Sequence, residues 1–357
     1  MFLYAGLVTY FALQVNVTED NRILRDDSLL SVSPERGGVI IIGFLRHVTV
    51  LTVIFVVNLV SIFAFEVLYA VIQSSIVMAS IADDQWATFC SNSLYQWSGL
   101  WTVWRADTRQ VRDKFRGVRS FIALDEAKTV VKHQNLFETE DGTEKLSRPG
   151  HEGPWTILKK DTDESGFCHP ALPEARCVFH SNGGGVWTRV KDIVVKPFAA
   201  EMFLCRGEFR CSVIVAYDES KHLRSFSTIR EKKLNTQGEM WSSSAVLQNG
   251  LDLSNLDEGF IGVEKTFDKN LQLNVVSGCK WNKEFWLNGS QDNGAEANTL
   301  FFLPDSICLS APCKLSSNSF SLRSCVLFPL REEKELQEVT VTYVDGCLHS
   351  VKQGLYH

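Results

Sequence analysis

The chain has 357 residues, 45% hydrophobic and 22% charged, which is enough for two domains that each bury a core. The formal net charge of −6 argues against nucleic acid as the main partner, because that binding depends on neutralising phosphates. The ten cysteines include no CxxC pair, so zinc-site and disulfide frameworks have little support and a reducing compartment is favoured.

The first 77 residues differ in composition from the rest of the chain. Residues 48–65 are eighteen positions without a charge, and as a helix they would span about 27 Å, close to the hydrocarbon thickness of a bilayer. Three interpretations stay open. The segment is a membrane anchor, an unusual targeting segment, or sequence that lies upstream of a working protein starting at Met78. Acidic residues within positions 1–35 argue against an ordinary transit peptide.

From Trp97 onward the chain predicts short strands and no long helix after residue 80. Side chains alternate between two faces from Trp97 to Trp104, which is the period of a strand, and Asp345–Gly346 is a strong hairpin signal. We expect strands at 97–104, 120–124, 130–138, 155–159, 176–180, 185–190, 201–205, 208–217 and 223–231, then a linker at 232–239, then strands at 240–247, 259–267, 271–277, 283–287, 299–303, 320–328, 338–344 and 347–355.

A pattern of three consecutive strands occurs twice, at 198–226 and again at 320–351. A long period seen only twice indicates two related domains and not a solenoid. The sequence therefore predicts an all-β protein of two tandem antiparallel β-barrels, at 86–235 and 236–357, preceded by the apolar segment 1–77.

Two surfaces are candidates for binding. The cluster of Trp97, Trp101 and Trp104 is either one wall of a ligand cavity or packing that plugs a barrel. The stretch 105–119 is either a solvated hairpin or a docking face for an acidic partner. Its basic residues are Arg105, Arg109, Arg112, Lys114, Arg116 and Arg119.

No catalytic, cofactor-binding or metal-binding motif is recognisable. Gly-x-Ser-x-Gly and a second zinc-hydrolase histidine are absent, and His133, His169 and His180 have no carboxylate at a characteristic spacing. We expect a protein that is not an enzyme and that holds no cofactor.

The chain resembles the plant and cyanobacterial family of tandem lipocalin-like proteins. The resemblance is carried by residues 94–115, 132–139, 217–233 and 283–289. It implies two lipocalin-like (calycin) barrels with a signature of Gly99, Trp101 and Arg230, in which Gly99 leaves room beside Trp101 and Arg230 packs over it. Such a cation–π contact is worth about 0.5–2 kcal/mol.

The same resemblance implies a function in the chloroplast stroma. The protein would be an assembly factor for the catalytic head of the chloroplast ATP synthase, contacting its β and γ subunits. The alternative is a barrel that binds a hydrophobic ligand or a bilin, as related chromophore lyases do, and an aromatic-lined cavity with a few polar groups would favour it. A third interpretation, a membrane-anchored binding module, depends on residues 48–65.

Overall fold

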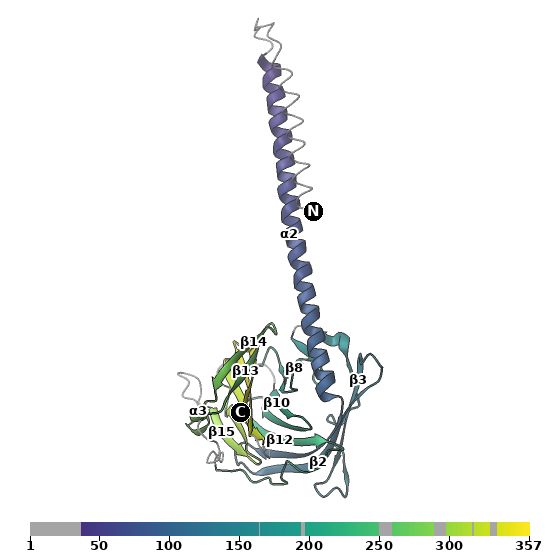
Figure 1. The fold of residues 1–357 in the computed structure, drawn as a ribbon, viewed down its shortest axis with the longest axis vertical. Helices are drawn as coiled ribbons and strands as arrows, with labels where there is room; N and C mark the ends of the chain where they lie inside the picture. The colour runs from purple at the N-terminus through teal and green to yellow at the C-terminus, as the bar shows by residue number, and fades with distance from the viewer. Residues whose placement is uncertain are drawn as a thin grey trace. The chain divides into compact units, whose positions relative to one another are not determined.

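The computed structural model describes residues 37–163, 165–193, 197–249, 259–288, 298–315, 318–328 and 334–357 (Figure 1). The chain forms two compact units, Met1–Gln73 and Ser74–His357. The upstream-sequence and targeting interpretations concern residues 1–77, of which positions 1–36 lie outside the described residues.

Helix α2 spans Gly37–Ser93 and contains the helix expected at 48–65. The expectation that no helix follows residue 80 is wrong. Trp86, Phe89 and Cys90 recur at helical spacing, and all three are buried in a core cluster of the first barrel. The helical repeat of buried residues here covers little more than one turn, so it is easily missed in the sequence before the long strand pattern that follows it.

The first sheet, here called barrel 1, contains twelve described strands in the order β4-β3-β2-β1-β12-β11-β10-β9-β8-β7-β6, with β5 paired to β3. Its strand pairs are antiparallel, and the first strand pairs with the last, which joins the two ends of the segment at the middle of the sheet. The strands are β1 Gln96–Arg105, β2 Val111–Ala123, β3 Val130–Glu138, β4 Lys145–Leu146, β5 Trp155–Leu158, β6 Thr162–Asp163, β7 Gly166–Cys168, β8 Ala175–Phe179, β9 Gly185–Arg189, β10 Phe198–Arg206, β11 Phe209–Tyr217 and β12 Leu223–Lys233, with a short 3-10 turn η1 at Lys159–Asp161.

The second sheet, barrel 2, repeats this arrangement with seven described strands in the order β14-β13-β19-β18-β17-β16-β15. Its first strand again pairs with its last. The elements are β13 Ile261–Asp268, β14 Leu273–Lys280, helix α3 Lys283–Asn288, β15 Asn298–Leu303, β16 Ile307–Pro312, β17 Phe320–Phe328, β18 Glu335–Val344 and β19 Cys347–Tyr356. The prediction of a mostly β protein built from two antiparallel sheets is confirmed.

The two barrels share the largest hydrophobic cluster, and each also has a smaller cluster of its own. The shared cluster contains buried residues of both sheets, and the rings of Phe226 and Phe301 lie 4.3 Å apart across the junction. Gln337 of barrel 2 accepts from the backbone N–H of Cys205 and donates to its carbonyl, so it acts as an added strand partner. Tight apolar packing with paired polar groups indicates a rigid junction.

Two expected strands are wrong. Segment 240–247 forms no strand, because it is held by side chains: Trp241 donates to the carbonyl of Glu231, and Trp104 donates to that of Ala245. Segment 283–287 is helical in α3, since neighbours Phe285 and Trp286 are both buried and a strand would turn one of them outward.

Candidate binding site inside the first barrel

Alternation along β1 and β2 places every second side chain inside barrel 1. Trp97 pairs with Arg119 across these strands, Gly99 with Gly117, and Trp101 with Phe115. The interior of barrel 1 therefore combines large rings with charged groups.

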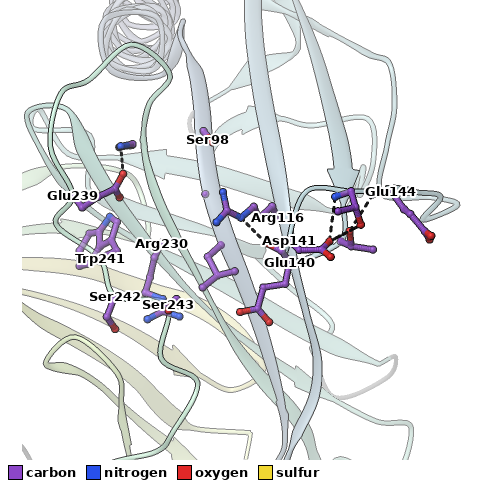
Figure 2. Close-up of a pocket in the computed structure, with 15 residues that line it drawn as sticks. Ser98, Arg116, Glu140, Asp141, Glu144, Arg230, Glu239, Trp241, Ser242 and Ser243 are labelled. Carbon is purple, nitrogen blue, oxygen red and sulfur yellow. Dashed lines mark hydrogen bonds and ion pairs between the residues drawn. The ribbon is translucent and has the colours of Figure 1, made fainter.

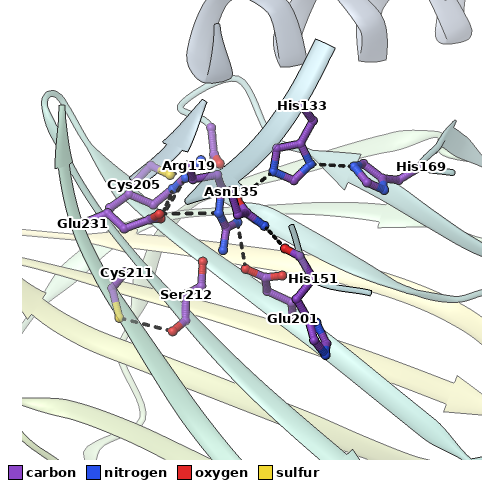
Figure 3. A network of polar contacts seen from close by, with 12 residues as sticks. Arg119, His133, Asn135, His151, His169, Glu201, Cys205, Cys211, Ser212 and Glu231 are labelled. Carbon is purple, nitrogen blue, oxygen red and sulfur yellow. Dashed lines mark hydrogen bonds and ion pairs between the residues drawn. The ribbon is translucent and has the colours of Figure 1, made fainter. Parts of the chain in front are cut away.

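Four charged side chains form a buried network inside the barrel (Figure 3). Arg119 lies 3.1 Å from Glu201 and 3.4 Å from Glu231, and Arg210 lies 2.7 Å from Glu231. All four are under 10% exposed, so two positive and two negative charges are balanced away from water. Burial alone would lower the pKa of Arg119, but the carboxylates of Glu231 and Glu201 outweigh it and raise that pKa.

A chain of hydrogen bonds with defined direction runs through two histidines. The backbone N–H of Ala171 donates to His169 Nδ1 (3.1 Å), so the proton of His169 sits on Nε2 and faces His133 Nδ1 at 2.7 Å. His133 Nε2 then donates to Asn135 Oδ1 at 3.1 Å, and Asn135 donates to the carbonyl of His151. Both rings are neutral in this arrangement.

Burial keeps both histidines neutral at ordinary pH. Desolvation lowers the pKa of His169 to about 4, helped by the charge of Arg119. Desolvation likewise lowers the pKa of His133 well below its ordinary value, and the neighbouring His169 adds to the effect. The two neutral histidines form a fixed, hydrogen-bonded pair. The ring of His133 also provides a flat surface, on which Phe121 stacks with ring centroids 4.2 Å apart.

Aromatic rings surround these polar groups. Trp101 stacks on Phe115 at 5.5 Å and meets Phe137 edge-on at 5.2 Å. Trp155 and Trp187 lie against His169, with ring centroids 5.4 Å and 5.0 Å away. The wall formed is flat, apolar and polarisable.

The predicted packing of Arg230 over Trp101 is wrong. Trp101 pairs with Ile229, so the adjacent Arg230 points to the opposite face of β12. There it contacts Asp305 of barrel 2 and helps to join the barrels. The cation over Trp101 is Arg119, whose guanidinium carbon lies 5.2 Å from the ring centroid.

A glycine is required at position 99, but the side chain that needs the space is Glu231 and not Trp101 as expected. A Cβ at Gly99 would lie 2.5 Å from Cγ of Glu231, so this glycine makes room for the buried carboxylate. The space beside Trp101 comes from Gly117, where a Cβ would lie 3.0 Å from the indole nitrogen.

Three indole nitrogens inside barrel 1 have no hydrogen-bond partner among the described residues: those of Trp97, Trp101 and Trp187. Trp97 is 1% exposed. A buried N–H without an acceptor costs about 1–3 kcal/mol, so these donors are groups that a bound acceptor would stabilise.

The six basic residues of the predicted docking face separate in the structure. Arg105, Arg109, Arg112 and Arg116 are exposed, whereas Lys114 is half-buried and paired with Glu140. Including Arg119 in that face is wrong, because strand alternation turns it into the barrel and onto Glu201 and Glu231.

A hollow of about 1000 Å³ lies on the outer face of β1 and β12 (Figure 2). Several of its charged groups have protein partners: Lys232 contacts Glu239, Arg116 donates to the backbone carbonyl of Glu140, and Asp141 accepts from neighbouring threonines. These groups already have protein partners, which makes the hollow a weaker candidate than the barrel interior.

Across the described segments, no group of three or more His, Cys, Asp or Glu side chains could hold a metal ion. Sequence reasoning missed the histidine pair and the network of Arg119, Arg210, Glu201 and Glu231. The available signal was the strand period, which places Arg119 on the same face as Phe115 and Phe121.

Residues 82–236 match the model of the family described as "Domain of unknown function (DUF3598), N-terminal". No curated protein matches the chain. Among solved structures, the chain is similar to a DUF3598-family protein of unknown function from Nostoc punctiforme, with 14% identity, 76% of this chain and 98% of that chain covered, and a TM-score of 0.54. This likeness concerns the fold alone.

An S-type phycobiliprotein lyase from Guillardia theta also matches, with 10% identity, 42% of this chain and 92% of that chain covered, and a TM-score of 0.28. A TM-score of this size does not establish a shared fold.

Proposed function

We propose that barrel 1 binds an apolar, conjugated small molecule with carbonyl acceptors, of which a bilin is the representative probe, and performs no catalysis. The observation that carries this proposal is the set of unpartnered indole donors of Trp97, Trp101 and Trp187 in an aromatic interior. Flat rings favour a planar ligand, and free N–H groups favour one with hydrogen-bond acceptors.

The charge balance narrows the ligand class. Arg119 and Arg210 are already paired with Glu201 and Glu231, so the interior offers no net positive charge to a buried carboxylate. We therefore expect neutral acceptors, such as lactam carbonyls, to face the indoles, and any carboxylates of the ligand to reach solvent.

The test is a titration of the full chain, held in mild detergent, with biliverdin. Binding is followed by the absorbance and induced circular dichroism of the pigment. The probe variants replace Trp97 or Trp187 with β-(3-benzothienyl)alanine, which keeps the ring shape and removes the N–H. Loss of one hydrogen bond should weaken binding about 2–12-fold.

The matched controls carry the same replacement at Trp281 or Trp286 in barrel 2, and their affinity should be unchanged. Absence of saturable binding would overturn the proposal, and so would equal losses in the variants of both barrels.

A second candidate function is supported by the exposed arginines. Arg105, Arg109, Arg112 and Arg116 present positive charge on the β1–β2 hairpin, and such charges steer an acidic partner. By its resemblance to the chloroplast biogenesis factor required for ATP synthase, the protein would assemble the catalytic head of that enzyme in the stroma. Binding to purified β and γ subunits tests this candidate.

A further inference from the structure

The middle of α2 is apolar around most of its circumference. Residues Leu51–Ile72 satisfy the length and composition of a membrane span, and none of that segment is buried. Phe55, Val60 and Phe63 are 65%, 62% and 72% exposed. A helix that is hydrophobic all round belongs either in a protein core or in a bilayer, and exposure of this kind is not that of a core helix.

The length fits a bilayer. The 22 residues of Leu51–Ile72 rise about 33 Å as an α-helix, against a hydrocarbon core of about 30 Å. An aqueous helix of that length would leave a continuous apolar surface in water, which soluble proteins avoid.

Two polar side chains within the span form hydrogen bonds to the helix itself. Asn58 donates to the carbonyl of Ile54 at 2.9 Å, and Ser61 donates to that of Val57 at 2.8 Å. Intrahelical bonding of this kind removes the cost of placing these groups in lipid. The charged Glu66 lies toward the C-terminal end, with Tyr69 beyond it, as expected near a membrane interface.

We propose that Leu51–Ile72 of α2 spans a lipid bilayer and anchors the two barrels to it. A second copy of the chain is a poorer occupant, because a helix pair covers one stripe of each helix and the apolar surface here goes all round. The same helix continues to Ser93, and its last turns contribute Trp86 and Phe89 to the core of barrel 1, so the span and the barrel are connected through one continuous helix.

The experiment is synthesis of the full chain in a cell-free system with phosphatidylcholine–phosphatidylglycerol vesicles, followed by an alkaline carbonate wash and flotation. The chain should float with the vesicles after the wash. The variant V60D/I62D places two carboxylates at the centre of the span, at a cost of about 5–7 kcal/mol, and should stay in the soluble or aggregated fraction.

The matched control S74D/S75D carries the same charges beyond the span and should float. All nine tryptophans lie at position 86 or later, so an unchanged tryptophan emission spectrum shows that V60D/I62D leaves the barrels folded.

Three results would overturn the proposal. The wild-type chain could be stripped by carbonate, or form a discrete soluble oligomer without vesicles. Mass spectrometry could also show cleavage between the span and Trp86, as for a removed targeting segment.

Discussion

The two barrels place the same kinds of side chain, indoles and carboxylates, in their interiors, but the carboxylates accept from different donors in each. In barrel 2, the indoles of Trp281 and Trp286 donate to one carboxylate oxygen of Glu338, at 3.1 Å and 3.0 Å, and Thr340 donates to the other. In barrel 1, the carboxylates are occupied by arginines, and the indoles of Trp97 and Trp187 are left without partners in the described segments.

This difference concerns the indole donors. Barrel 2 satisfies the indoles of Trp281 and Trp286 internally, and α3 supplies Phe285 and Trp286 to its core. Barrel 1 keeps indole donors that have no acceptor among the described residues. If barrel 1 binds a ligand as proposed, its capacity depends on these unmatched indole donors and not on the number of aromatic residues.

The largest expected effect comes from breaking the charge network of barrel 1. Arg119→Met leaves Glu201 buried without its cation, and we expect a loss of about 3–5 kcal/mol of stability. Urea unfolding followed by tryptophan emission measures this loss. Arg116→Met, an exposed neighbour on β2, should change stability by about 0.5 kcal/mol or less. Equal effects of the two substitutions would show that the network adds nothing.

Acid should weaken barrel 1 through its histidines. The pKa of His169 is about 4 in the folded protein and about 6.5 when unfolded, so the unfolded state binds more protons between these values. Stability is fully present above pH 6.5, falls by a few kcal/mol as the pH approaches 4, and then levels off for this group. His180, with a pKa of about 3, adds to the same trend.

Urea midpoints from pH 7 to pH 4 test that trend, with His169→Gln as the comparison. The variant should lose part of the slope. An identical slope in both proteins would place the acid sensitivity in the carboxylates alone.

Removing single indole N–H groups sharpens the comparison between the barrels. Benzothienylalanine at Trp286 deprives the buried Glu338 of a donor, and we expect a loss of about 1–3 kcal/mol. The same replacement at Trp97, without ligand, removes a donor that has no acceptor and should change stability by less than about 0.5 kcal/mol. Thermal unfolding of both variants measures the difference, and equal losses would mean that the Trp97 N–H is satisfied in solution.

Sequence patterns predicted the barrels well and their interiors poorly. The period of two along β1 and β2 identifies faces, but the strand was expected only from residue 120, so Arg119 was assigned to the docking face and not beside Phe115. Its partner Glu201 is 82 positions away, and their contact depends on strand register and on how the sheet rolls up. Likewise, Arg230 was assigned to the wrong face because a one-residue step reverses the side of a strand.

The smallest effect on stability, and a large one on association, is expected at the exposed arginines. The variant R109E/R112E/R116E should lose at most about 1 kcal/mol, because these residues are exposed and exposed charges contribute little. If the β1–β2 hairpin docks on an acidic partner, affinity for ATP synthase β and γ subunits should fall about tenfold or more, and most steeply at low salt. The control K191E/K269E/K280E introduces the same charge change at other exposed sites. Similar losses in both variants would assign the effect to net charge, whereas a loss confined to the hairpin would identify a docking face distinct from the ligand site proposed for barrel 1.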